Sequence, residues 1–145
     1  MKPAPATRQL LLAASVAIAS QWLLSWLLPR IPGIAGSDLQ TAAGWLSPAS
    51  YVAVALAMGI GGWIAGYRFV PFAVGINLLI WLVILTVLAE MSAPITEKPF
   101  LRNLGASLQF NALGMACSLL AAAAGAALGA WLHRRRNLPP TVTTP

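Results

Sequence analysis

Charged side chains are scarce in this sequence. Only 8% of its 145 residues are charged, and Asp and Glu together number 3. A soluble domain carries about 25% charged residues, which cover the surface that faces water. Disordered chains need low hydrophobicity, whereas 59% of this chain is hydrophobic. The composition therefore excludes an ordinary soluble domain and a disordered chain, and it predicts an integral membrane protein.

Groups that carry out chemistry are also scarce. The chain has 1 Cys and 1 His, so it cannot form an internal disulfide, and no Cys/His pair has the spacing of metal ligands. His133 stands beside three arginines and is interpreted as an interfacial residue. No motif joins a nucleophile to a base. We therefore expect a non-enzymatic protein with no catalytic, cofactor-binding or metal-binding residues.

Four apolar runs lack Asp, Glu, Lys and Arg, at 10–28, 51–66, 70–89 and 107–132. Crossing the hydrocarbon core takes about 20 helical residues, so each run predicts one transmembrane helix. The expected fold is all-α, a four-helix transmembrane bundle that forms a single domain over 1–137. The remaining segment, 138–145, is rich in Pro and Thr and is expected to be disordered.

The first run has a second interpretation. Lys2 and Arg8 precede it, and Ala17-Ile18-Ala19 resembles a signal-peptidase site that would release 1–19 before Ser20. The apolar run continues to Leu28, however, and is longer than the core of a removed signal peptide. We favour a retained helix and keep cleavage as the alternative.

Basic residues predict the orientation. Six of them lie in the two terminal segments and the 67–69 link, with no acid beside them: Lys2, Arg8, Arg68, Arg134, Arg135 and Arg136. The other two connections hold three basic residues and all three acids: Arg30, Lys98, Arg102, Asp38, Glu90 and Glu97. The positive-inside rule then places both termini in the cytoplasm, and we expect a bacterial inner membrane. Because the charges flank apolar runs, we expect no binding to nucleic acid.

The three C-terminal arginines have a possible second role. Arg134, Arg135 and Arg136 could contact anionic lipid, at about 1 kcal/mol each near the surface. The role of these three arginines in setting the membrane orientation is enough to account for their presence.

The connections carry their own signals. Ser37-Asp38-Leu39-Gln40 matches a capping box, which predicts a short interfacial helix from about Asp38 to Leu46 in the first outer loop. The 66–71 segment predicts a tight turn between two antiparallel spans, and 99–104 predicts one helical turn before Gly105.

Small residues recur at four-residue spacing in two spans. Ala53, Ala57 and Gly61 lie on one row, and Ala121, Gly125 and Gly129 on another. Such rows let helix backbones approach closely, within the chain, in self-association or against other membrane proteins. We also expect Trp81 to fill the space beside Gly61.

Polar side chains within the spans are the candidate functional residues. Gln21 and Ser118 lie near mid-membrane by helical rise, so a hydrogen bond between them is expected, and Asn77 is a further candidate. Proton-coupled carriers place an ionisable group at this depth, and none is present. The favoured function is a subunit or accessory of a membrane assembly.

The alternative is a small oligomeric channel or carrier for an ion or small solute, with Gln21, Asn77 and Ser118 along its path. A water-accessible cavity shared by all three would favour transport. If the three side chains were instead buried in contacts that exclude water, a role in an assembly would be favoured.

Overall fold

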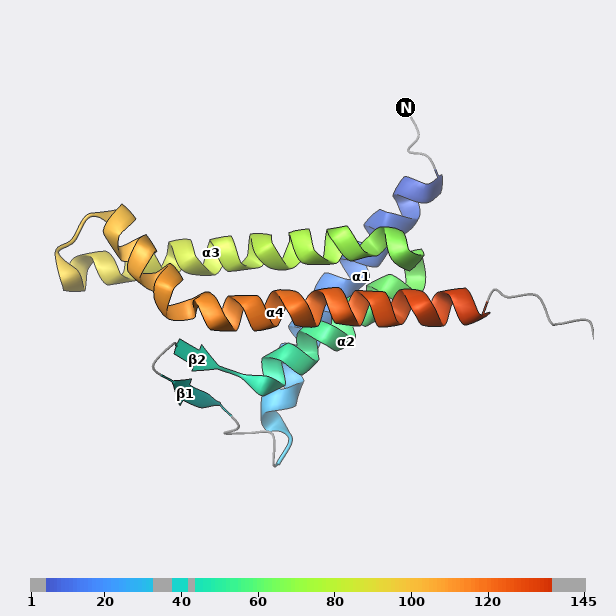
Figure 1. Ribbon diagram of the computed structural model, residues 1–145, viewed down its shortest axis with the longest axis horizontal. Coiled ribbons are helices and arrows are strands. Elements are labelled where there is room, and N and C mark those ends of the chain that lie inside the picture. Colours follow the sequence, from blue (N-terminus) through green and yellow to red (C-terminus); the bar gives the residue numbers. More distant parts are fainter. Residues whose placement is uncertain (1–4, 33–37, 42–43, 137–145) are drawn as a thin grey trace, which may run out of the picture.

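The described residues fold into helices joined by short connections. The structure, a computed structural model, describes residues 5–32, 38–41 and 44–136. Along the chain the elements are α1 (Pro5–Leu27), the 3-10 turn η1 (Leu28–Arg30), β1 (Leu39–Thr41), β2 (Gly44–Leu46), α2 (Pro48–Ala65), the 3-10 turn η2 (Gly66–Phe69), α3 (Val70–Thr96) and α4 (Phe100–Arg136). Every long element is helical, as expected for an all-α membrane fold (Figure 1). The 138–145 segment, which was expected to be disordered, lies outside the described residues.

Length and composition fit a membrane protein. Three helical stretches are long and apolar enough to cross a bilayer, Ala6–Arg30, Pro48–Thr96 and Phe100–Arg136. The middle stretch contains α2, η2 and α3. Large apolar side chains point outward on all four helices, and Trp22 is 81% exposed. Soluble monomers rarely expose an apolar surface of this extent, which fits a membrane protein.

The helices pack as two crossing pairs. α3 and α4 run antiparallel beside each other, and α1 and α2 cross them obliquely (Figure 1). α2 packs most extensively on α4, α1 packs chiefly on α2, and α3 chiefly on α4. η2 forms the tight turn that was expected, but α2 and α3 hardly touch beyond it, because α4 packs against both. The two spans are therefore joined by the expected turn, but each packs chiefly on α4 instead of on the other.

Two ends of the molecule can be distinguished. The beginning of α1, η2 and the end of α4 lie toward one end, at the right of Figure 1. The β1–β2 hairpin and the connection between α3 and α4 lie toward the other. We call the first the η2 end and the second the hairpin end.

Small residues bring the backbones of α2 and α4 into direct contact. A Cβ added to Gly62 would collide with the carbonyl oxygen of Ala126, and one on Gly129 with that of Gly59. A Cβ on Gly125 would likewise collide with the carbonyl oxygen of Ala55. Gly125 and Gly129 of the predicted α4 row therefore pack within this chain, against Ala55 and Gly59, which lie outside the predicted α2 row.

The apolar core of the molecule lies near the η2 end. Its buried cluster combines residues of all four helices with Phe69 of η2, whose ring is fully buried. That ring occupies the place where a Cβ on Gly61 would lie. The expectation that Trp81 fills this space is wrong, since α3 diverges from α2 while η2 folds back onto it.

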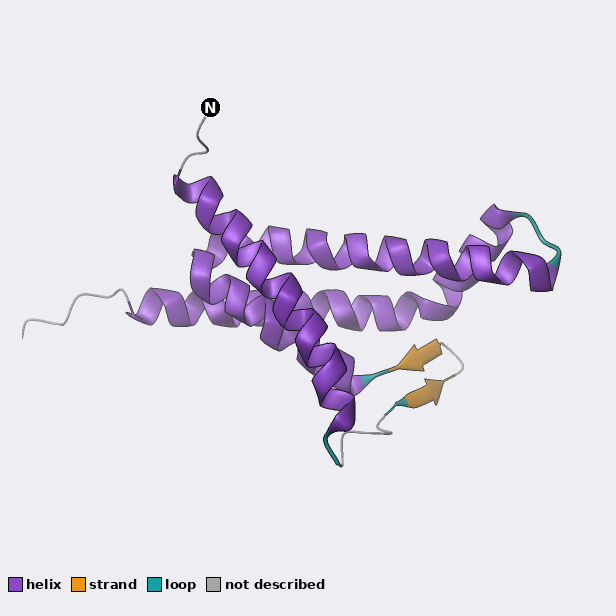
Figure 2. Ribbon diagram, turned by 180° about the vertical axis from the view of Figure 1, so that it is seen from behind, coloured by secondary structure: helices purple, strands orange, loops and turns teal. Residues whose placement is uncertain are grey.

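The first outer loop contains strands where a helix was expected. Leu39–Thr41 and Gly44–Leu46 pair antiparallel, with Gln40 opposite Trp45 (Figure 2). Gly44 has φ +120°, and a Cβ there would collide with the carbonyl oxygen of Phe110 on α4. An isolated helix of about nine residues is marginal. The interfacial helix over 38–46 is therefore wrong, because an extended strand allows the loop backbone to lie directly on α4.

Two helices extend beyond the predicted spans. α3 continues past residue 89 to Thr96, and α4 begins at Phe100 and passes through Gly105 without a break. The expected helical turn at 99–104 is thus the first part of a long helix. Asn103 closes the short connection, since its Nδ2 donates to Lys98 O (3.3 Å) and its Oδ1 accepts from Thr96 Oγ1 (3.0 Å).

Candidate functional site

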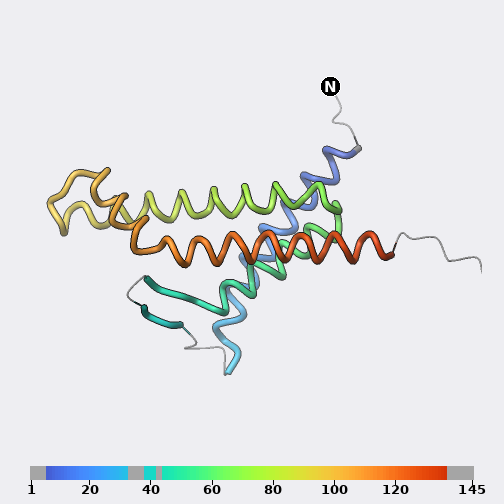
Figure 3. The backbone as a smooth tube through the Cα atoms, viewed as in Figure 1, coloured from blue at the N-terminus to red at the C-terminus, as the bar shows by residue number. Residues whose placement is uncertain are grey.

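The three polar residues singled out in the sequence line one cavity. Gln21 of α1, Asn77 of α3 and Ser118 of α4 surround a space of about 600 Å³ between α1 and α3. Ser25 of α1 and Ser50 and Tyr51 of α2 add further polar groups to the lining. In Figure 3 the traces of α1 and α3 diverge from the η2 end toward the hairpin end.

Asn77 and Ser118 satisfy each other at the base of the cavity. Asn77 Nδ2 donates to Ser118 Oγ (2.9 Å), and Ser118 Oγ donates to Asn77 Oδ1 (3.2 Å). Asn77 is 1% exposed and Ser118 5% exposed, so the pair is removed from solvent. This reciprocal bond ties α3 to α4 in a region where an unpaired amide would cost several kcal/mol.

Gln21 has a different environment. The hydrogen bond expected between Gln21 and Ser118 is not formed, because Ser118 pairs with Asn77 instead. The Gln21 Oε1 atom is buried, and no described residue donates to it. Buried acceptors are normally satisfied by protein or by a bound molecule. Gln21 therefore lines the cavity while its Oε1 atom stays unsatisfied within the surrounding packing.

The walls of the cavity are apolar and its lining carries no charge. Ile18 and Trp22 of α1 face Ile80, Trp81 and Ile84 of α3. A neighbouring cavity of about 400 Å³ shares Ile18, Ile80 and Ile84 and adds only aliphatic residues of α3. The lining includes the Tyr51 hydroxyl but no Asp, Glu, His, Lys, Arg or Cys side chain. Its chemistry suits the binding of an uncharged molecule.

Toward the η2 end the cavity is closed. One helical turn from Gln21, Val54, Asn77 and Ser118 in that direction lie four residues that are 0% exposed: Ala17, Met58, Ala73 and Ala122. All four belong to the buried cluster around Phe69. The cavity therefore ends inside the molecule and does not continue through it.

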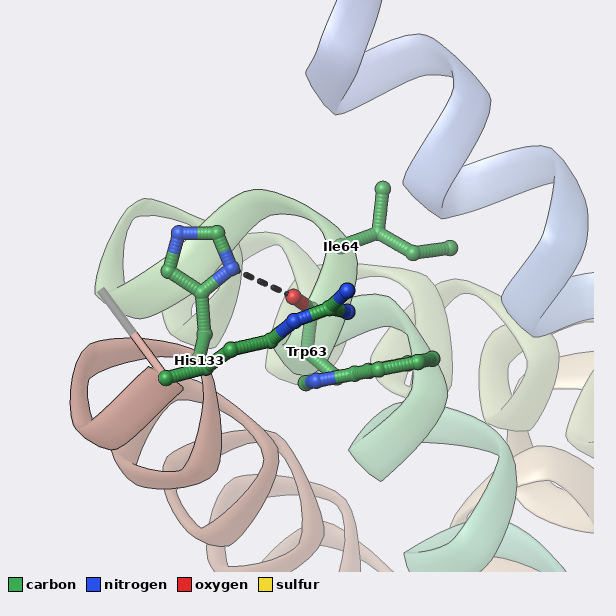
Figure 4. A pocket seen from close by; sticks show the side chains of 4 residues that line it. Trp63, Ile64 and His133 are labelled. Atoms are coloured by element: carbon green, nitrogen blue, oxygen red, sulfur yellow. Dashed lines mark hydrogen bonds between the residues drawn. The ribbon is translucent and has the colours of Figure 1, made fainter.

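A second, more polar hollow lies at the η2 end. It measures about 390 Å³ and is lined by Trp63, Ile64, His133 and Arg136 (Figure 4). His133 Nδ1 donates to the carbonyl oxygen of Trp63 at 2.6 Å, which places the imidazole at the end of α2. The Arg136 guanidinium lies 5.8 Å from the Trp63 ring centroid, and that of Arg135 lies 3.9 Å from the Trp131 centroid. Arg134 is exposed beside them.

Sequence reasoning missed part of the cavity lining. Ser25 lies one turn beyond Gln21 on α1, and Ser50 and Tyr51 begin α2. The four-residue spacing of Gln21 and Ser25 was the available signal, but their partners come from helices whose crossing the sequence does not give. Among the described residues, no group of three or more His, Cys, Asp or Glu is placed to hold a metal ion.

Comparison of the chain with protein-family models, with curated proteins and with solved structures gives no match.

Proposed function

We propose that this chain is a non-enzymatic multi-pass protein of a bacterial inner membrane, where it serves as a subunit or accessory of a larger membrane assembly. One observation carries the proposal. Outside the long helices, the described chain consists of two three-residue strands and short connections. Such segments are too small to hold a separate active site, so the protein must act through surfaces inside the bilayer.

The proposed topology has four crossings, one for each of α1 to α4, with both termini in the cytoplasm. The turn at η2 divides the middle apolar stretch into two antiparallel parts. The elements toward the η2 end carry only basic charges: the beginning of α1 has Arg8, η2 has Arg68 and the end of α4 has the arginines at 134–136. The connection between α3 and α4, toward the hairpin end, carries Glu97 together with Lys98. This distribution supports a cytoplasmic η2 end.

Reporter fusions test the topology. Fusions truncated after residues 32, 68, 98 and 136 should report outside, inside, outside and inside, with alkaline phosphatase active only outside and green fluorescent protein fluorescent only inside. An externally placed residue 136, or fewer than four crossings, would contradict the proposal.

Isolation from membranes in a mild detergent tests the assembly. The tagged full chain should leave a sizing column together with other membrane proteins in fixed ratio, and chemical cross-linking in intact membranes should capture the same partners. The small-residue rows do not contribute to this expectation, because most of their residues are buried within the chain. A homogeneous monomer without cross-linked partners would refute it.

A small oligomeric channel or carrier is the second candidate, and the shared cavity favours it. Gln21, Asn77 and Ser118 line one space, as a polar path would require. Single cysteines at these positions, in a Cys117→Ser background, should react with a membrane-impermeant thiol reagent if the cavity is open to water. Protection of all three would exclude a hydrated path.

A further inference from the structure

We propose that the hollow at the η2 end binds the phosphate of one anionic lipid, and that Arg136 is the cation that holds it. The ligand class is a phosphodiester lipid whose headgroup carries no positive charge, such as phosphatidylglycerol. The inference goes beyond the proposed function, since it assigns a binding site to one of three neighbouring arginines. It requires only that the η2 end lies at a membrane surface, whichever side that surface faces.

The three consecutive arginines at the end of α4 have different environments. The Arg135 guanidinium lies 3.9 Å from the centroid of the Trp131 ring, four residues earlier on the same helix. Arg134 is exposed and does not line the hollow. Arg136 and His133 are three residues apart on one helix face, and both line it. The sequence makes the three arginines equivalent, whereas the structure places only Arg136 at the hollow.

Contacts between α4 and α2 define the shape of the hollow. His133 Nδ1 donates to the carbonyl oxygen of Trp63 at 2.6 Å, which ties the last turns of α4 and α2 together (Figure 4). Ile64, the next residue of α2, lines the hollow and also packs against the buried cluster. The Arg136 guanidinium lies 5.8 Å from the Trp63 ring centroid, within reach of a cation–π contact. The walls of the site are therefore already assembled in the folded chain.

The charge around the hollow favours an anion. The helices α1, α2 and α4 and the turn η2 contain no Asp or Glu. The nearest acid on α3 by sequence is Glu90, about 30 Å along the helix from its start at Val70. A phosphate at Arg136 can form charge-assisted hydrogen bonds. The ammonium group of a zwitterionic headgroup would find no carboxylate on these elements, so an anionic lipid is favoured over a zwitterionic one.

The mixed lining favours a lipid over free phosphate. Trp63 and Ile64 form an apolar wall beside His133 and Arg136. Trp63, Tyr67 and Trp131 are each between 41% and 52% exposed, and such aromatic rings prefer the level of the lipid headgroups. The volume of about 390 Å³ falls inside the range of small-molecule sites. A lipid can therefore place its phosphate at Arg136 while its acyl chains follow the apolar surface of the helices.

Photo-crosslinking of the full chain in phosphatidylcholine nanodiscs tests the proposal. The probe is phosphatidylglycerol with a diazirine at the start of one acyl chain, present as a minor lipid. Mass spectrometry should locate the label on peptides from the ends of α2 and α4. Unlabelled phosphatidylglycerol should displace the probe. Phosphatidylethanolamine, which carries an ammonium group, and glycerophosphoglycerol, which lacks acyl chains, should not displace it.

Two variants with matched controls separate the site from the general charge of the helix end. Arg136→Gln should weaken labelling about tenfold, because it removes a hydrogen bond between charged groups. Arg134→Gln removes the same charge from the same exposed helix end, and it should weaken labelling less than about twofold, because a charge outside the site is screened. Trp63→Ala should weaken labelling about threefold, whereas Trp131→Ala should not. The unfolding midpoint of each variant shows whether it is folded.

Several results would overturn the inference. Equal losses for Arg134→Gln and Arg136→Gln would leave only a general attraction between basic helix ends and anionic lipid. Displacement by phosphatidylethanolamine would remove the preference for an anionic lipid, and displacement by glycerophosphoglycerol would assign the hollow to a soluble phosphate. The proposed assembly is tested by partner capture, which should be the same for Arg136→Gln and the wild type. The two proposals can therefore fail separately.

Discussion

Two regions of this molecule pack differently. α2 and α4 are in close contact, whereas a gap separates α1 from α3. In the first, Gly62, Gly125 and Gly129 allow backbone to touch backbone, and no space for a Cβ remains. In the second, Ile, Trp and Gln side chains face a cavity of about 600 Å³. Because lipid is as apolar as leucine, helices in a bilayer associate through close packing and polar hydrogen bonds. The hydrophobic effect does not bring poorly packed helices together there. The close contact therefore holds α2 on α4, whereas α1 and α3 leave a cavity between them.

The largest expected effect comes from breaking the tight contact. Gly129→Val places a side chain against Gly59 O and should destabilise the protein by about 3 kcal/mol. The midpoint of thermal unfolding in mild detergent measures this loss. Gly105→Val is the matched control on the same helix, since nothing lies within 4 Å of its Cβ, and it should change stability by less than about 0.5 kcal/mol. Equal effects of the two variants would show that α2 and α4 do not meet in this way.

The next effect concerns the polar bond beside the cavity. Asn77→Leu leaves the buried Ser118 hydroxyl without its partner and should cost about 2 kcal/mol of unfolding free energy. A double-mutant cycle with Ser118→Ala, followed by thermal unfolding, should give a coupling of about 0.6 kcal/mol. Additive losses would mean that the two side chains do not bond in the membrane.

Gln21 should behave in the opposite way. Its Oε1 has no described donor, so Gln21→Leu in ligand-free detergent should leave stability unchanged or raise it by about 1 kcal/mol. Comparison of its unfolding midpoint with that of Asn77→Leu tests the contrast within one cavity. A loss as large as that of Asn77→Leu would indicate that Gln21 is satisfied within the folded chain.

The smallest effect tests the open side of α3. Nothing lies within 4 Å of a Cβ at Gly75, so Gly75→Ala should stabilise the helix by about 0.5 kcal/mol. The same substitution at Gly62 should destabilise, because its Cβ meets Ala126 O. If both alanine variants were stabilising in thermal unfolding, the distinction between a closed and an open contact would be lost.

Hydropathy and helical rise predicted much of the fold. The apolar run at 70–89 lies within α3, and the turn at 66–69 is present, because these features depend on local composition. The hairpin at 39–46 was not predictable, since its strands are stabilised by contact with α4, where Gly44 meets Phe110. The helix signal in that segment was a local preference that tertiary contact overrode.

The sequence predicted which polar residues belong to the candidate site, but it did not predict their hydrogen-bond partners. Gln21, Asn77 and Ser118 stood out because amides and hydroxyls are costly in hydrocarbon. Their depths did not reveal that Ser118 bonds to Asn77, or that Ser25, Ser50 and Tyr51 join the same cavity. Pairing depends on which faces of two helices meet, and this is decided by their crossing.

From its amino acids alone, this protein was bound to form apolar helices with arginine-rich ends, because twelve charged side chains cannot cover a water-facing surface. Only the tertiary structure decided that Phe69 fills the space at Gly61 and that Gln21 remains without a donor. The physical reason is that helix formation depends on neighbours along the chain, whereas a cavity depends on the angle at which distant helices cross.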